Sequence, residues 1–190
     1  MKKLAIFASG NGSNAQNIIE HFKGSETARV TLIISNKPGA YVLERAAALG
    51  VPSVVIPREH LTAENPAQLL ALLQEQGIDY IILAGYLLKI PAALTETYKG
   101  KIINIHPALL PKFGGKGMYG NHVHQAVIDA AEKESGITIH LVDSNYDSGS
   151  ILFQATCPVL PDDTPETLAE RIHSLEKEHF ARIIEEYITK

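Results

Sequence analysis

Short apolar runs alternate along the chain with segments in which apolar residues recur every three or four positions. The runs predict buried strands, and the amphipathic segments predict helices between them. The expected strands are residues 4–8, 30–34, 54–56, 80–84, 101–106, 136–142 and 151–159; the expected helices are residues 15–22, 41–49, 66–76, 123–134 and one starting at Thr164-Pro165. This order predicts an α/β fold with a doubly wound, Rossmann-like, mostly parallel sheet covered by helices on both faces. The short loop 143–150 predicts that one of the last two strands runs antiparallel.

Composition narrows the functional classes. A chain of 190 residues with 45% hydrophobic and 20% charged residues predicts a single folded domain over residues 1–190. The net charge of −4 and the lack of a long basic run argue against nucleic-acid binding. Cys157 is the single cysteine, and no apolar run has the length of a membrane helix. We therefore expect a cytoplasmic protein, monomeric or homodimeric, that acts on small molecules without a membrane.

The first candidate site is the turn Ser9-Gly10-Asn11-Gly12-Ser13-Asn14-Ala15, between an expected strand and an expected helix. Glycines allow close backbone approach, and the first amides of a helix attract a phosphate. The pattern also matches the dinucleotide fingerprint, but Asn36 stands where that motif requires an acid. A phosphate site is favoured, with a dinucleotide site and a plain capped turn as alternatives.

The second candidate site is Asn104-Ile105-His106-Pro107. Alternation along a strand places Asn104 and His106 on one face, and Pro107 ends the hydrogen-bonded ladder. An amide can donate to a developing oxyanion, and an imidazole can act as general acid or base. The alternative is a core histidine satisfied by a backbone carbonyl, but the paired Asn104 and the strand-end position favour catalysis.

The third candidate site is the segment Asp143-Ser144-Asn145-Tyr146-Asp147-Ser148-Gly149. Its spacing imitates the start of a calcium loop, but the required Gly and Glu are missing at Ser148 and Gln154, so no calcium site is expected. A turn held by side-chain hydrogen bonds is one interpretation. The other is that Asp147 lies beside His106 and raises its pKa, which would provide a general acid. No metal site is expected from His106, His122, His124 or His140. His122 and His124 are two positions apart on an expected helix, where ligands would need to be three or four apart, and the single Cys157 adds no thiolate cluster.

Four segments together resemble one family, the glycinamide ribonucleotide formyltransferases, which use folate in purine biosynthesis. The segments are FASGNGSN (7–14), LAGYLLKI (83–90), INIHPALLPKFGGKG (103–117) and YDSGSILFQ (146–154). Related folate formyltransferases share the Asn-x-His and Asp set but carry an extra domain, for which 190 residues leave no room. Departures occur at Leu87-Leu88, Ala108 and Lys177, and they bear on how the folate tail is bound.

The resemblance implies residue roles and a formyltransferase fold. It implies that the ribonucleotide is bound by Gly12, Ser13, Asn14 and Glu176, and that the catalytic set is Asn104, His106 and Asp147. It implies that 10-formyltetrahydrofolate, the co-substrate, is bound by Leu87, Leu88, Lys89, Ile90, Asn104, Asp143, Ser144, Asn145, Tyr146 and Asp147. Direct transfer of the formyl group to the substrate amine is then expected, with no metal.

Two further interpretations stay open. The glycine-rich loop 112–120 either closes over bound substrates to exclude water or is an ordinary surface loop. The chain as a whole could also be a nicotinamide oxidoreductase or a non-catalytic binding protein on the same fold. The missing acid near Asn36 disfavours the oxidoreductase.

Overall fold

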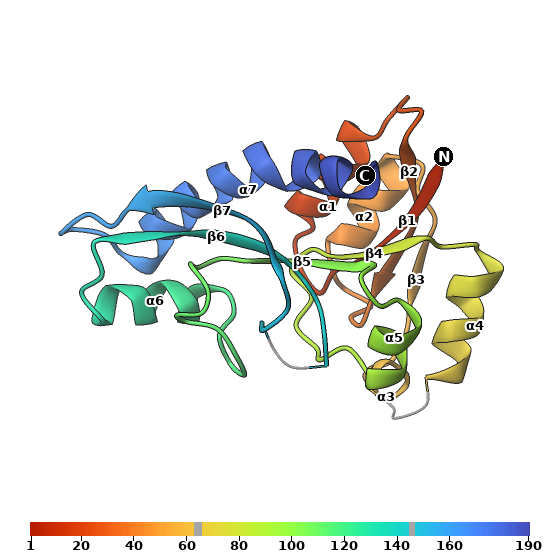
Figure 1. Ribbon diagram of the computed structural model, residues 1–190, viewed down its shortest axis with the longest axis horizontal. Coiled ribbons are helices and arrows are strands. Elements are labelled where there is room, and N and C mark those ends of the chain that lie inside the picture. The colour runs from red at the N-terminus through yellow and green to blue at the C-terminus, as the bar shows by residue number, and fades with distance from the viewer. Residues whose placement is uncertain (63–65, 145–146) are drawn as a thin grey trace.

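A single mixed sheet forms the centre of the computed structural model, which describes residues 1–62, 66–144 and 147–190 (Figure 1). Its strands are β1 (Lys2–Phe7), β2 (Ala28–Ser35), β3 (Ser53–Val55), β4 (Tyr80–Leu83), β5 (Ile102–His106), β6 (Glu134–Leu141) and β7 (Ile151–Pro158), in the spatial order β3-β2-β1-β4-β5-β6-β7. The pairs among β1 to β5 are parallel, whereas β6 runs antiparallel to both β5 and β7. The predicted Rossmann-like sheet with one antiparallel strand is confirmed.

Helices follow most of the predicted segments. They are α1 (Ser13–His21), α2 (Val42–Ala48), α3 (Arg58–Leu61), α4 (Ala67–Glu75), α5 (Ala92–Thr97), α6 (Asn121–Asp129) and α7 (Pro165–Ile188). Helices α3 and α5 were not predicted, because four and six residues are too few to show a helical period. The predicted end of α6 at residue 134 is wrong, because Ala131 adopts a left-handed φ of 52° and Glu134 already begins β6.

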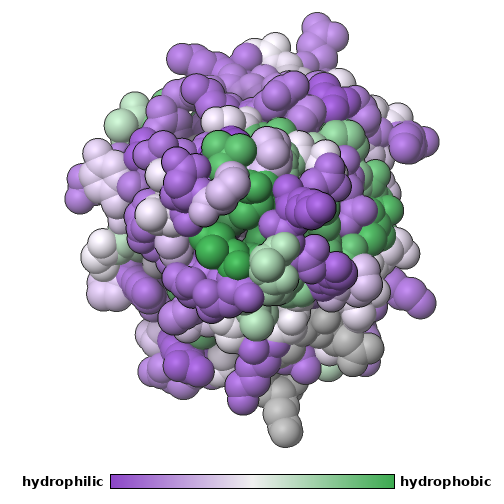
Figure 2. Space-filling view, turned by 90° about the vertical axis from the view of Figure 1, so that its left-hand side faces the viewer, coloured by the Kyte–Doolittle hydropathy of each residue, from purple (hydrophilic) through white to green (hydrophobic). Residues whose placement is uncertain are grey.

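The sheet separates two apolar layers, as a doubly wound fold requires. Along β1, Leu4 and Ile6 pack with α1, α2 and α7, whereas Ala5 and Phe7 pack with α3, α4 and α5. This alternation follows from the period of two along a strand. Figure 2 shows the end of the molecule that carries α6, where hydrophilic side chains surround a central group of apolar ones. Within the described residues, no helix is both long and apolar enough to cross a membrane.

The start of α7 is fixed by local chemistry. Thr164 is the N-cap, and its side-chain oxygen accepts a hydrogen bond from the backbone N–H of Thr167. The side-chain oxygen of Thr167 in turn accepts from the backbone N–H of Thr164. Pro165 occupies the first turn, where its missing N–H is harmless. This cap sets the register of a 24-residue helix, and that register decides which side chains of α7 reach the cavity described below.

The order in which successive strands are added to the sheet reverses between the parallel neighbours β1 and β4. From β1 the chain proceeds outward through β2 and β3, and from β4 it proceeds the other way through β5. The loops after these two adjacent strands therefore diverge and leave a crevice at their carboxyl ends. Both the glycine turn after β1 and the Gly85–Ile90 segment after β4 lie at this crevice.

Candidate active site

A cavity of about 710 Å³ occupies the crevice. Most residues predicted to bind or react line it: Gly12, Ser13, Asn14, Leu87, Leu88, Lys89, Ile90, Asn104, His106, Asp143, Asp147 and Glu176. Ser144 lies outside this lining, and Asn145 and Tyr146 fall outside the described residues. The topology thus gathers segments that are distant in sequence around one space.

The turn after β1 leaves the first amides of α1 without a side-chain cap. Gly12 is the N-cap with a left-handed φ of 78°, and no side-chain cap hydrogen bond is formed there. A Cβ on Gly12 would lie 2.5 Å from Cγ2 of Val42, so the turn packs directly against α2. Uncapped amides at a helix N-terminus, together with the helix dipole, favour a bound anion. The alternative of a turn capped by Asn11 or Ser13 is therefore not supported.

Side-chain and backbone groups of α2 form hydrogen bonds to this turn. The Arg45 guanidinium donates to the backbone oxygen and the side-chain oxygen of Asn11, both at 2.8 Å, and also to Gln16 Oε1. The Val42 N–H donates to the Gly10 carbonyl at 3.1 Å. These bonds fix the backbone before a ligand arrives, which reduces the ordering that binding requires.

A buried serine connects the two loops of the crevice. Ser9 Oγ donates to Asn36 Oδ1 at 2.6 Å and accepts from the Leu87 N–H at 3.1 Å. Asn36 is the residue that stands in place of the dinucleotide-binding acid, and its side chain here serves the loop connection. The dinucleotide interpretation is therefore not supported by this site.

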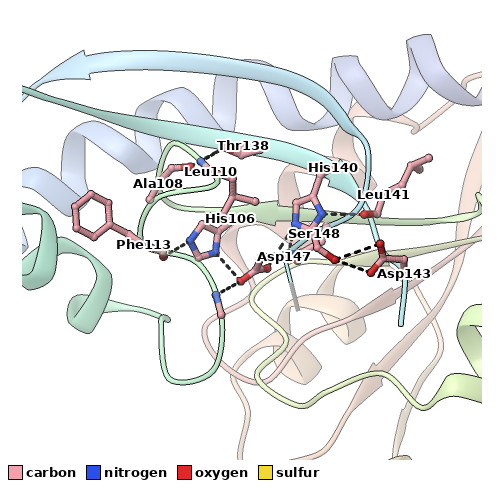
Figure 3. A network of polar contacts seen from close by, with 12 residues as sticks. His106, Ala108, Leu110, Phe113, Thr138, His140, Leu141, Asp143, Asp147 and Ser148 are labelled. Atoms are coloured by element: carbon pink, nitrogen blue, oxygen red, sulfur yellow. Dashed lines mark hydrogen bonds and ion pairs between the residues drawn. The ribbon is translucent and has the colours of Figure 1, made fainter. Parts of the chain in front are cut away.

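His106 ends β5 and is only 3% exposed (Figure 3). Its Nε2 lies 2.7 Å from the carbonyl oxygen of Phe113, which can only accept, so the neutral ring carries its proton on Nε2. Its Nδ1 faces Asp147 Oδ2 at 3.8 Å. The expected neighbourhood of His106 and Asp147 is thus present, although 41 positions separate them in the sequence.

Asp147 is held by the loop that follows β5. The Gly115 N–H donates to Asp147 Oδ2 at 2.8 Å. A Cβ on Gly114 would lie 2.6 Å from Cδ2 of Leu110 and 3.3 Å from the Cβ of Asp147, so the loop packs closely here because residue 114 has no side chain. Asp147 and Phe113 both adopt left-handed φ values, 50° and 55°, and strained backbone of this kind gathers at functional sites.

His140, on β6, completes the polar group around Asp147. Its Nδ1–H donates to the Leu141 carbonyl at 2.9 Å, so its Nε2 accepts from Asn104 Nδ2 at 3.0 Å. The same Nε2 lies 3.6 Å from Asp147 Oδ1. Antiparallel pairing of β5 and β6 places Asn104 directly opposite His140, and this bond orients the Asn104 amide.

The pKa of His106 departs from the expected direction. Burial lowers it below the usual 6.5, and the attraction of Asp147 offsets only part of that effect. The prediction of a raised pKa is therefore wrong for the ligand-free site, because removal from water outweighs one carboxylate. Burial alone would raise the pKa of Asp147, but contact with His140 and the Gly115 N–H holds it below its usual value. Near neutral pH the pair is a neutral imidazole beside a carboxylate.

Another part of the cavity lining is formed where α7 meets the glycine turn. Glu176 is 6% exposed, and its Oε2 accepts from Asn14 Nδ2 at 2.9 Å and lies 3.0 Å from His173 Nδ1. Glu176 raises the pKa of His173 above its usual value. Two predicted ribonucleotide residues from distant segments are thus in direct contact.

Several residues at this site were not singled out as site residues by the sequence. His140 and His124 were considered only as metal ligands, and Ser9 was read as part of the glycine turn. His173 is one helical turn before Glu176, an i, i+3 spacing that could have marked it. Among the described residues, no group of three or more side chains is arranged to hold a metal ion.

Comparison with known proteins places the chain in a family. Residues 2–184 match the sequence profile of the formyl transferase family. The chain is 44% identical to a chloroplastic phosphoribosylglycinamide formyltransferase of Arabidopsis thaliana, over 98% of this chain and 67% of that protein. It is 36% identical to phosphoribosylglycinamide formyltransferase of Haemophilus influenzae, over 97% and 86%. A crystal structure of glycinamide ribonucleotide transformylase 1 from Geobacillus kaustophilus superposes with a TM-score of 0.90 at 38% identity, covering 99% of both chains. The chain therefore belongs to the formyl transferase family.

Proposed function

We propose that this protein transfers a formyl group from 10-formyltetrahydrofolate to the amine of glycinamide ribonucleotide, giving formylglycinamide ribonucleotide in purine biosynthesis. The observation that carries the proposal is one cavity lined both by the uncapped N-terminus of α1 and by the Asn104, His106 and Asp147 group. The relatives named above act, by their names, on phosphoribosylglycinamide.

The ribonucleotide is assigned to the side of the cavity between α1 and α7. Its phosphate would accept from the amides at Gly12, Ser13 and Asn14, whose orientation Arg45 supports. Glu176, bonded to Asn14, would accept hydrogen bonds from neutral or positively charged parts of the same substrate. This arrangement directs the substrate amine toward β5.

The formyl folate is assigned to the segments after β4 and β6. Leu87, Leu88, Lys89 and Ile90 offer apolar surface and backbone groups, and Asp143 lies on the same cavity wall. Ser144, Asn145 and Tyr146 belong to the same proposed segment, although the structure does not place Ser144 in the lining or describe the other two. Asn104 and Asp147 would contact the reacting end of the folate.

The chemistry needs one oxyanion donor and one proton path. When the amine attacks the formyl carbon, the carbonyl oxygen becomes an oxyanion, and the Asn104 amide is oriented to donate to it. The attacking nitrogen must lose a proton, and neutral His106 can accept it on Nδ1, where Asp147 stabilises the resulting imidazolium. His106 then returns this proton to N10 of the folate as the carbon–nitrogen bond breaks. The proton lost by the amine is the one gained by the leaving nitrogen, so the site finishes in its starting state.

The loop 112–120 has a place in this proposal. Residues Gly115 through Gly120 line the cavity, and Gly115 is bonded to Asp147. Loop contact at this point would exclude water that could hydrolyse the formyl donor. A variant with the loop shortened should lose kcat/KM and release formate without transfer. Unchanged kcat/KM would show that the loop is an ordinary surface segment.

The test is an absorbance assay of folate deformylation with purified protein, 10-formyltetrahydrofolate and glycinamide ribonucleotide. Transfer predicts turnover that requires the ribonucleotide and that collapses in His106→Ala. Deformylation without the ribonucleotide would instead indicate a hydrolase. Normal ligand binding with no turnover in the wild type would indicate a binding protein. A cytoplasmic location belongs to the same proposal; the Arabidopsis relative is named chloroplastic.

A further inference from the structure

His124 is a buried histidine with no assigned role. It lies in α6, is 2% exposed and lines the cavity. Its Nδ1 is fully buried, and no hydrogen-bond partner for it exists among the residues that the structure describes. Buried polar atoms in native proteins almost always have a partner, so an imidazole with an unpartnered nitrogen in a cavity lining is a candidate for contact with a ligand in that cavity.

His124 shares the cavity lining with both groups of site residues. Those close enough for their charges to act on it are His173 and Glu176 from α7 and His106 from β5. Glu176 is bonded to Asn14 in the glycine turn, so it belongs to the group around the proposed phosphate site. His106 belongs to the group at the proposed site of formyl transfer. A ligand that contacts both groups in this cavity would pass close to His124.

The charge state of the His124 ring indicates which part of the ligand it can bind. Burial lowers the pKa of His124, and His173 lowers it further, so the ring is neutral near pH 7. A neutral imidazole has one donor and one acceptor, which matches a hydroxyl group better than a phosphate dianion. In the ribonucleotide, the sugar is what connects the phosphate to the glycinamide arm.

We propose that His124 hydrogen-bonds a sugar hydroxyl of the ribonucleotide and thereby positions its amine at Asn104 and His106. This inference rests on the proposed function and extends it to a residue outside the expected binding set. His122 provides a matched control, because it is an exposed histidine on the same helix and does not line the cavity.

The experiment measures kcat and both KM values for wild type, His124→Phe, His124→Asn and His122→Gln, using the ribonucleotide and its 2′-deoxy and 3′-deoxy analogues. His124→Phe should raise the KM for the ribonucleotide about tenfold and leave the KM for the formyl folate unchanged. His124→Asn, whose amide nitrogen lies near the position of Nδ1, should recover part of the loss. For the wild type, the KM for one of the two deoxy analogues should be about ten times the KM for the ribonucleotide. For His124→Phe, the KM for that analogue should equal its KM for the ribonucleotide.

Two outcomes would overturn the inference. The first is an unchanged KM for the ribonucleotide in His124→Phe. The second is that each deoxy analogue raises KM by the same factor in the wild type and in His124→Phe. If thermal unfolding shows that His124→Phe is not folded, His124→Leu repeats the comparison with a smaller apolar side chain. Failure of the proposed function is distinguishable, because the wild type itself would then show no ribonucleotide-dependent turnover.

Discussion

The side-chain amide of Asn14 donates to the Glu176 carboxylate at 2.9 Å across 162 positions of sequence. This bond joins the glycine turn after β1 to the middle of α7 and defines one wall of the cavity. It also means that Glu176 is held in place by the protein itself before any substrate binds.

Glu176→Ala should weaken ribonucleotide binding specifically. The change removes the acceptor for Asn14 and for His173 and leaves both polar groups without their partner. We expect the KM for the ribonucleotide to rise about tenfold or more while the KM for the formyl folate changes little. Glu178→Ala, an exposed carboxylate on the same helix, is the control. Equal effects on both KM values would argue against the assignment.

Asp147→Asn should lower kcat with little effect on ribonucleotide binding. Asparagine tolerates the left-handed φ of 50° as aspartate does, so the backbone is expected to be retained. The carboxylate that stabilises protonated His106 is lost, and we expect kcat to fall about 100-fold. Steady-state kinetics beside Asp162→Asn, an exposed carboxyl, measure this. A kcat within twofold of wild type would exclude Asp147 from the proton path.

Gly12→Ala should destabilise the protein. The new methyl group would lie 2.5 Å from Val42 Cγ2 and force a left-handed backbone on alanine, so we expect a loss of about 2 kcal/mol or more in the free energy of unfolding. Gly10→Ala is the matched control, because a Cβ there meets nothing within 4 Å. Urea denaturation of both variants gives the comparison. Similar stabilities would mean that α2 shifts freely to admit the methyl group.

Stability should fall as the pH is lowered through the histidine range. His106 and His124 both have a pKa below 6.5 in the folded protein, so in this window the unfolded chain binds more protons than the folded one. His173 acts in the opposite direction, because its raised pKa stabilises the fold at low pH and that contribution is lost as the pH rises. Urea denaturation between about pH 7.5 and 5.5 should show a net fall.

His106→Gln should make that dependence on pH shallower, because the variant has one fewer imidazole to keep neutral in the folded state. His60→Gln, at an exposed position in α3, should leave the dependence as in the wild type. An identical slope in His106→Gln and wild type would show that burial of His106 is not linked to folding.

Hydrophobic periodicity was enough to predict the strands, the longer helices and the mostly parallel sheet. These features are set by which residues avoid water, and that preference is local and can be read from sequence. The short helices α3 and α5 could not be predicted in this way, since each is shorter than two turns. The strand-end positions of Asn104 and His106 and the glycine turn could also be recognised, because alternation and chain reversal are properties of neighbouring residues.

Only the tertiary structure decided how the side chains of the proposed site are paired. The pairing of Asn104 with His140 depends on the register of two antiparallel strands, and the contact of Asn14 with Glu176 depends on how α7 packs against α1. The lowered pKa of His106 depends on burial by segments far away in the chain, and sequence spacing contains no measure of that burial. The residue types that the proposed chemistry needs are therefore visible in the sequence, whereas their partners and protonation states follow from long-range packing.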